Sequence, residues 1–414
     1  MEKPVFYIKF FLSRNFSALK HSNFRVFWAL QAISLIGSWM QTISLPWLAY
    51  TMTESALFVG IIGALQFLPT IFFSLFAGVI IDRFNKRKLM LMTQSLMAIF
   101  AFILSLLVIS DMTEPWHLVV ITLLIGVANS LDLPSRQSLM IELVGKSDLM
   151  NAIALNSSIF NLARILGPAI AGVLMSLVGI GFCFLINSLS FIPVIISLAF
   201  FIKPAFSYFR NEKKHILTDI ADGLKYIKND SLLLFTFISV VIMGTFAMNF
   251  MVLVPVFAQE ILKVEEAKFG LLMSFMGIGS FSGSLIIASI SKKGPSEKFL
   301  MICSFILPVF ILLNGISVHY FMSAILLGCA GIFAVMFFTT ANSLIQLNSK
   351  DEFRGRVISV YTLLSVGSAP LGNFLTGLIS QKMGARSGFI MNALVIILLI
   401  SAFFIIKTLI LKKK

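Results

Sequence analysis

The sequence predicts an all-α integral membrane protein with twelve transmembrane helices, and both its composition and its pattern of apolar runs support this fold class. Of the 414 residues, 58% are hydrophobic and only 12% are charged, whereas an ordinary soluble domain carries about 25% charged residues. A soluble fold this apolar would lack the polar surface that keeps a protein in solution. Runs of about 20 mostly apolar residues, the length that spans a bilayer, recur from one end of the chain to the other.

Short polar loops separate the apolar runs, so the ends of each helix can be placed to within about 3 residues. The predicted transmembrane helices span residues 24–50, 57–81, 89–110, 116–140, 151–178, 181–202, 232–259, 267–290, 298–317, 319–346, 356–381 and 387–408. Residues 1–23 are basic and partly aromatic, and the apolar run behind them is longer than the core of a signal peptide. We therefore interpret this start as a cytoplasmic amphipathic lead-in.

The distribution of basic residues predicts the orientation of the chain. With the N-terminus in the cytoplasm, the cytoplasmic segments carry 27 of the 32 Lys and Arg residues, and the outer loops carry 4. This asymmetry follows the positive-inside rule. It also supports an even number of crossings, with both termini in the cytoplasm of a bacterial-type inner membrane, because one missed helix would scramble the alternation.

A polar, basic segment divides the chain into two halves. Residues 1–202 and 232–414 each hold six predicted helices, and residues 203–231 link them. Within the linker, apolar residues recur at helical spacing between charged ones, which predicts a helix on the cytoplasmic surface or a solvated linker helix. The apolar positions are Ile216, Ile220, Leu224 and Ile227.

The two halves repeat each other in sequence. Leu166-Gly-Pro168 in the fifth helix matches Ser368-Ala-Pro370 in the eleventh, and Phe184–Leu189 in the sixth matches Phe389–Leu394 in the twelfth. Duplicated bundles that meet at an interface are how many transporters build a central site. The repeat therefore predicts two six-helix bundles around a central cavity.

One loop motif resembles a known superfamily. The stretch Gly78-Val-Ile-Ile-Asp82-Arg83-Phe-Asn85-Lys86-Arg87-Lys88 resembles the cytoplasmic signature between helices 2 and 3 of the major facilitator superfamily. It departs at Asn85, where the signature usually has Gly, but Asn tolerates left-handed backbone better than most residues. The resemblance implies that superfamily's fold.

Three further stretches narrow the resemblance: residues 132–137, 151–168 and 351–357. Together they are similar to the drug:proton antiporter branch that includes the enterobactin exporter and macrolide efflux proteins. The resemblance implies a secondary transporter that exports a small amphipathic molecule such as a siderophore or a drug. It would need no cofactor and would use the proton gradient as its energy source. The resemblance also implies a monomer whose partners are its substrate and the membrane lipids.

The superfamily motif also has a physical rationale as a gate. Asp82 can accept hydrogen bonds from the positive end of a neighbouring helix, and Arg83, Lys86 and Arg87 can reach the acidic end of helix 4 at Glu142. Contacts made in one conformation and lost in the other set the balance of alternating access. The alternative is that the positive loop only fixes topology. The complete predicted gating set is Gly78, Asp82, Arg83, Lys86, Arg87, Glu142, Arg354 and Arg356.

Few charges fall inside the apolar runs, where each costs several kcal/mol unless it is paired or hydrated. Asp132 and Arg136 lie in helix 4, and Arg164 lies near the middle of helix 5. We expect Asp132 to pair with Arg136 or Arg164, or to alternate between them. The pair is either purely structural or linked to proton coupling or substrate. Arg164 has its own alternatives, since it could face a water-filled cavity and attract anionic substrates, or only fix helix 5 against helix 4.

The superfamily resemblance implies that helices 1, 4, 7 and 10 line the central path. Amides there can orient a ligand, and aromatic rings can stack on flat or greasy ones, although each ring could equally serve packing and lipid contact. The predicted cavity residues are Gln31, Gln41, Asn129, Phe246, Asn249, Phe250, Phe337, Phe338 and Asn342. In helix 5, Gly167, Pro168 and Gly172 should soften or bend the helix, and the resemblance associates this element with antiporters.

Several other function classes are disfavoured. The net charge of +14 sits in short loops and forms no face for nucleic acid. The three cysteines lie in apolar runs with no metal-ligand spacing, and the sequence has no G-x-x-x-x-G-K-[ST] loop for ATP. The four histidines lie near helix ends or in loops without a nucleophile motif, so an enzyme is not expected. A lipid or lysolipid flippase and a non-transporting scaffold stay open as alternatives.

Overall fold

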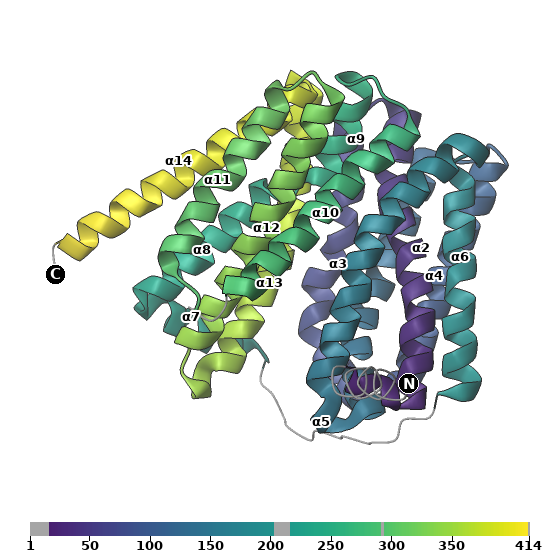
Figure 1. The fold of residues 1–414 in the computed structure, drawn as a ribbon, viewed down its shortest axis with the longest axis horizontal. Coiled ribbons are helices and arrows are strands. Elements are labelled where there is room, and N and C mark those ends of the chain that lie inside the picture. The colour runs from purple at the N-terminus through teal and green to yellow at the C-terminus, as the bar shows by residue number, and fades with distance from the viewer. Residues whose placement is uncertain (1–15, 203–215, 291–293, 413–414) are drawn as a thin grey trace, which may run out of the picture.

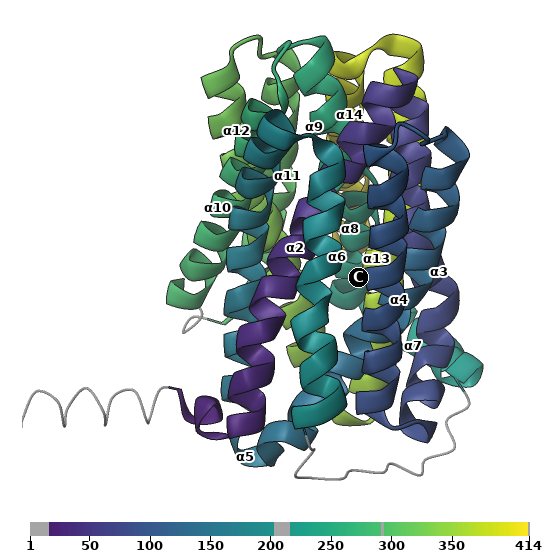
Figure 2. The same ribbon diagram turned by 90° about the vertical axis from the view of Figure 1, so that its right-hand side faces the viewer.

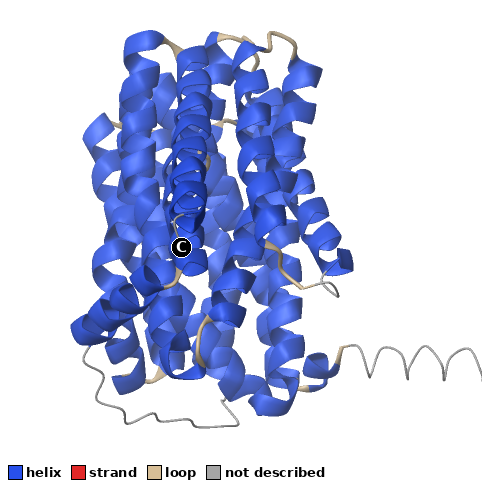
Figure 3. Cartoon of the chain, turned by 90° about the vertical axis from the view of Figure 1, so that its left-hand side faces the viewer, coloured by secondary structure: helices blue, strands red, loops and turns tan. Residues whose placement is uncertain are grey.

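The computed structural model describes residues 16–202, 216–290 and 294–412, apart from the side chains of residues 74–83, 216–220 and 408–412. Every regular element in these ranges is a helix (Figure 3). The predicted N-terminal lead-in therefore lies outside the described residues, except for its last part. There a short 3-10 helix, η1 (Ser17–Lys20), precedes the first long helix.

The first half of the chain forms one bundle. Its elements are α2 (Ser22–Thr53), α3 (Ala56–Arg83), α4 (Lys86–Ile109), α5 (Pro115–Val178) and α6 (Ile180–Ile196), which ends in a π-helical turn, η2 (Ser197–Phe201). Figure 2 shows α2, α6 and α4 side by side, and α6 packs against both of the others.

The second half forms another bundle. Its elements are α8 (Ser231–Phe246), α9 (Phe250–Glu260), α10 (Glu266–Ile290), α11 (Glu297–Ile316), α12 (Tyr320–Asn348), α13 (Asp351–Met383) and α14 (Ala385–Lys412). Between the halves, α7 (Ile216–Asn229) lies across the ends of α8 and α13 and packs against both. The end of the molecule that carries η1 and α7 is called the linker face below, and the opposite end the far face (Figure 1).

The predicted connection at residues 141–150 is shorter than expected, because α5 stays helical through this region except at Gly145. A straight helix of 64 residues would be about 96 Å long, roughly twice the thickness of a whole bilayer. Gly145 has φ 72° and ψ 179°, a backbone region that is essentially restricted to glycine. The chain therefore turns back at Gly145, and α5 makes two crossings as two arms.

Twelve crossings result. By length and hydropathy, eleven helical segments in the described residues could span a membrane when α5 is taken as one segment. The two arms of α5 raise the number to the predicted twelve.

The seventh predicted helix is broken, which the sequence analysis did not foresee. Residues 247–249 separate α8 from α9. The break leaves carbonyl groups at the end of α8 without their helical partners. The side-chain amide of Asn249 donates to one of them, the Thr245 carbonyl oxygen, over 2.6 Å.

The buried apolar residues show how the bundles meet. One large cluster runs from the C-terminal bundle into the far-face half of the N-terminal bundle, where it includes Trp47, Ile62 and Met175. The linker-face ends have separate cores instead. One core around Phe24 and Leu143 belongs to the first bundle, and another around Ile227 belongs to the second. The bundles therefore share one core near the far face and have separate cores near the linker face.

Candidate functional site

The interface between the bundles is built from two equivalent helix pairs. In one pair α3 packs against α13, and in the other the second arm of α5 packs against α10. A Cβ atom on Gly60 would approach the backbone of Gly377 to 2.9 Å, and one on Gly172 would approach Gly270 to 2.9 Å. Glycine at these positions lets the helix backbones touch, and both contacts lie in the far-face half.

Polar side chains add to the far-face closure. The Tyr50 hydroxyl donates to a carboxylate oxygen of Glu260 over 2.6 Å, and the Ser55 hydroxyl lies 2.9 Å from the side-chain oxygen of Gln381. Trp47 stacks on Phe269 with 4.6 Å between ring centroids. Each contact joins the first bundle to the second, and the sequence analysis had identified neither Glu260 nor Gln381.

The predicted gating residues separate into two groups. In the first bundle, the Lys86 ammonium lies 3.3 Å from a carboxylate oxygen of Glu142, and both side chains are largely buried. Arg87 does not reach Glu142 as predicted. It donates instead to the carbonyl oxygens of Leu198 and Ala199, because the π-helical turn at the end of α6 leaves carbonyls there without helical partners. The side chains of Asp82 and Arg83, and the surroundings of Gly78, lie outside what the structure describes.

The other two gating residues lie in the second bundle. Arg354 pairs with Asp351 over 2.7 Å and donates to the Gln346 carbonyl oxygen over 3.0 Å. Arg356 pairs with Asp222 over 3.2 Å and so joins α13 to α7. These contacts hold α13 against the end of α12 and against α7 at the linker face.

Asp132 is a buried charge with three hydrogen-bonding partners in the first bundle. Its side chain is 1% exposed and forms an ion pair with Arg136, one helical turn away. Thr93 and Gln94 on α4 donate to its other oxygen over 2.8 Å and 2.9 Å. Three donors stabilise the ionised carboxylate, and Arg136 rather than Arg164 supplies the positive charge. The sequence analysis did not identify Thr93 or Gln94.

Arg164 stands apart from this network. Its guanidinium donates a long hydrogen bond, over 3.4 Å, to the side-chain oxygen of Asn161 on the same helix, and its Nε is buried without a partner among the described residues. No acidic side chain in the described residues pairs with it. The structure therefore brings Asp132 and Arg136 together and leaves Arg164 as a separate cation.

Two predicted amides share a small chamber inside the first bundle. Gln41 on α2 and Asn129 on α5 line a cavity of about 60 Å³, which Gln66, Thr122 and Asn187 also line. The side-chain amide of Asn187 donates to Gln41 over 2.6 Å. This chamber lies one helical turn from Asp132 along α5, and it has room for about two water molecules. Gln31 lies outside it, 1% exposed and without a hydrogen-bond partner among the described residues.

The predicted cavity residues of the second bundle are mostly packed inside it. Phe250 and Phe337 are 2% and 0% exposed and belong to the large core cluster. Asn249 donates to Thr376 over 2.8 Å, and Asn392 donates to the same hydroxyl. These three residues, Phe250, Phe337 and Asn249, therefore stabilise the bundle in this conformation and do not line an open path.

The remaining predicted cavity residues are half-buried. Phe338 meets Phe337 edge to face, with 5.1 Å between ring centroids. Asn342 accepts a hydrogen bond from Gln346 over 3.0 Å. Phe246 packs against the large core cluster, beside the break between α8 and α9.

Gly167, Pro168 and Gly172 allow close helix packing. The second arm of α5 stays helical through all three, and the non-helical residue that interrupts α5 is Gly145. A Cβ atom on Gly167 would come within 3.2 Å of the Ile36 carbonyl oxygen on α2. These residues bring α5 close to α2 on one side and to α10 on the other.

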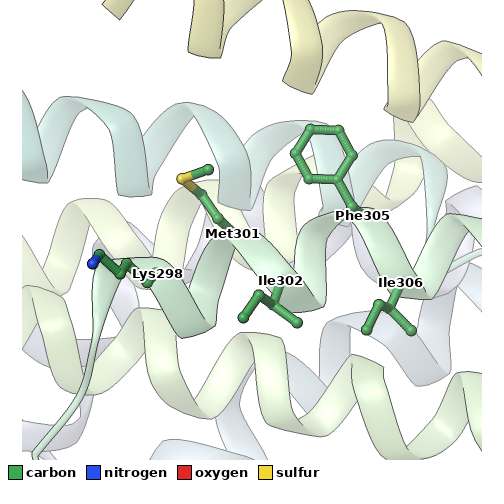
Figure 4. Close-up of a pocket in the computed structure, with 5 residues that line it drawn as sticks. All are labelled: Lys298, Met301, Ile302, Phe305 and Ile306. Atoms are coloured by element: carbon green, nitrogen blue, oxygen red, sulfur yellow. The ribbon is translucent and has the colours of Figure 1, made fainter. Parts of the chain in front are cut away.

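A larger hollow lies on the outer surface of the second bundle. It has a volume of about 390 Å³ and is lined by Met301, Ile302, Phe305 and Ile306 of α11, with Lys298 at its linker-face end (Figure 4). All five residues come from one helix, and the hollow does not lie between the bundles. Its apolar lining suits contact with lipid, so we do not assign it to the substrate path.

Comparison with known proteins places the fold and the class of activity. The family model described as transmembrane secretion effector matches residues 13–413. The staphyloferrin A transporter of Staphylococcus aureus is 26% identical over 363 residues, which cover 87% of this chain and 90% of that protein. Macrolide efflux protein A of Streptococcus pyogenes is 19% identical, covering 90% of this chain and 93% of that one. Multidrug efflux pump Tap of Mycolicibacterium fortuitum is 23% identical, covering 88% and 90%.

Solved structures share the architecture. A bacterial homologue of the human lysosomal transporter Spinster, in an inward-facing and unoccupied conformation, superposes with a TM-score of 0.75 at 12% identity, covering 95% of this chain and 98% of that one. The nucleoside transporter NupG superposes with the same TM-score at 13% identity, covering 92% and 98%. These likenesses confirm the predicted fold of two six-helix bundles. The similar proteins are transporters and not enzymes.

Proposed function

The chain belongs to the transmembrane secretion effector family of the major facilitator superfamily, and from this premise we propose that it exports a small amphipathic molecule, a siderophore or a drug, by proton antiport. The observation that carries the proposal is the similarity over nearly the full length to proteins named for siderophore transport, macrolide efflux and multidrug efflux. It is a membrane transporter that spans the bilayer many times.

We infer that the linker face lies in the cytoplasm of a bacterial inner membrane. The split of 27 basic residues against 4 supports this orientation. Reporter fusions test it, and both termini should report a cytoplasmic location. A terminus on the outside would contradict the inference.

The packing of the bundles supports transport by alternating access. A shared core and polar contacts close the far face, whereas separate cores support each bundle at the linker face. With the linker face in the cytoplasm, this conformation corresponds to an inward-facing state. Rocking of the bundles about the site between them would break the far-face contacts and produce the outward-facing state.

Asp132 is the residue that we propose for proton coupling. The groups around it are Arg136 on its own helix and Thr93 and Gln94 on α4, and the Lys86–Glu142 pair lies further toward the linker face. Proton uptake by the Asp132 carboxylate would compete with these contacts, so it requires the Arg136 pair to open during the cycle. A purely structural ion pair is the competing role.

Energised vesicles test both the proposed export and the proposed role of Asp132 in proton coupling. Everted vesicles should show substrate-dependent proton flux with a siderophore, a macrolide or another drug from a broad panel. If no compound of the panel produced proton flux, the result would contradict export and favour a scaffold. In vesicles that transport, Asp132→Asn should abolish the pH dependence of transport. Unchanged transport at every pH would leave Asp132 with the structural role.

A further inference from the structure

Arg164 is a half-buried cation whose charge no acidic side chain in the described part of the protein balances. Its guanidinium is weakly hydrogen-bonded to Asn161 over 3.4 Å, and its Nε has no partner. Two buried cations of the first bundle differ, since Arg136 pairs with Asp132 and Lys86 pairs with Glu142. Acidic side chains therefore neutralise Arg136 and Lys86, whereas the charge of Arg164 can still pair with a ligand.

The backbone of Arg164 lies at the interface between the bundles. Arg164 lies near the middle of the second arm of α5, about 28 Å along the helix from Gly145. A Cβ atom on Gly277 of α10 would come within 2.7 Å of the Arg164 carbonyl oxygen, and the Ser274 hydroxyl donates to the next carbonyl, that of Ile165, over 2.9 Å. Arg164 thus belongs to the crossing of α5 and α10, on the linker-face side of the closed contact between Gly172 and Gly270.

An unbalanced guanidinium at this depth is costly unless water or an anion solvates it. Its side chain keeps partial exposure, so a ligand can approach it. Asn161 accepts from the guanidinium and donates its own amide to the Ser157 carbonyl oxygen over 2.9 Å, which orients the arginine. A planar guanidinium presents paired donors that match the two oxygens of a carboxylate.

We propose that Arg164 is the anion-recognition residue of the substrate site, and that it binds a carboxylate or a similar oxyanion of the exported molecule. This inference rests on the proposed function, because it deepens the substrate class of the same central path. It selects anionic amphipathic molecules over neutral ones of the same shape.

A pair of probes that differ only in charge tests the proposal. N-dansylglycine carries a carboxylate, and dansylglycinamide replaces it with a neutral amide. Equilibrium dialysis against purified protein in nanodiscs, with empty nanodiscs as reference, should show at least about tenfold tighter binding of the carboxylate, the scale of a charge-assisted hydrogen bond. Arg164→Gln should remove this preference and leave amide binding unchanged, and Arg164→Lys should keep part of it.

Arg386→Gln is the matched control, because it removes the same charge from an exposed position at the start of α14. It should retain the preference for the carboxylate. The proposal is overturned if the wild type does not discriminate between the probes, if Arg164→Gln keeps the preference, or if Arg164→Gln weakens both probes equally, as loss of packing would. Thermal unfolding of each variant verifies that it is folded.

A transport measurement distinguishes the proposed anion site at Arg164 from the proposed export function. Proteoliposomes with an imposed pH gradient should move the carboxylate probe. Binding preference without proton-driven transport would support the anion site and contradict the exporter. Proton-driven transport without the preference would contradict the anion site alone.

Discussion

At the scale of single residues, the surroundings of Asp132 predict how much one hydroxyl contributes to stability. Thr93 is fully buried and donates to the Asp132 carboxylate over 2.8 Å. Thr93→Val removes that donor without changing the shape of the side chain. We expect the free energy of unfolding to fall by about 1.5–3 kcal/mol, the contribution of a hydrogen bond to a charged group. Denaturant or thermal unfolding of the purified protein measures the loss.

Thr122 provides a matched control in the same bundle. It is also buried, and its hydroxyl has no hydrogen-bond partner among the described residues. Thr122→Val should therefore lower stability much less than Thr93→Val, since it removes no hydrogen bond to a charged group. Equal losses for the two variants would mean that the bond from Thr93 to Asp132 contributes nothing.

The sequence could predict part of this site, because Asp132 and Arg136 lie four residues apart on one helix. That spacing alone places them on the same face. Thr93 and Gln94 come from another helix, and nothing in their local sequence indicates the direction in which they point. The depth of Arg164 was also predictable, but its choice of partner depends on how α5 is rotated against its neighbours, which a single sequence does not specify.

At the scale of helices, the crossing of α5 and α10 depends on glycine. A Cβ atom on Gly270 would come within 2.7 Å of the Gly172 Cα atom, and backbone cannot move aside as a flexible side chain can. Gly270→Leu should push the helices apart, lower stability by about 1–3 kcal/mol, and reduce transport by disfavouring the state in which the far face is closed. Thermal unfolding and vesicle transport measure the two effects.

Gly355→Leu is the control for this substitution. Gly355 lies on the exposed face of α13, and a Cβ atom there would meet nothing within 4 Å. Leucine favours helix over glycine, so this variant should be as stable as the wild type or slightly more so. A destabilisation as large as that of Gly270→Leu would rule out helix separation as the cause.

Helix existence was predictable from the apolar runs, whereas the interruptions of helices were not. The break at residues 247–249 lies within a continuous apolar stretch, and the amide of Asn249 stabilises it through a contact that forms only in the fold. The reverse error occurred at residues 141–150, where polar residues predicted a loop and one glycine was enough to turn the helix. Local composition indicates where a chain can turn, but tertiary packing decides where it does.

At the scale of the whole molecule, the repeat predicted two bundles, but it could not predict which end is closed. That choice depends on contacts between the halves. Tyr50 to Glu260 and Ser55 to Gln381 join the bundles at the far face, and both contacts must break for the bundles to rock. A covalent link across this face should therefore hold the transporter in one state.

Cysteines at Ser55 and Gln381 test this directly, in a background from which the three native cysteines have been removed. The two side chains lie 2.9 Å apart, so a short bifunctional thiol reagent should link them and reduce transport at least about tenfold, and a reductant should restore it. A link between cysteines at Ser317 and Ser323, whose hydroxyls lie 3.1 Å apart within the second bundle, should leave transport intact. Full transport with the far face linked would contradict rocking of the bundles, because this contact would then not open during the cycle.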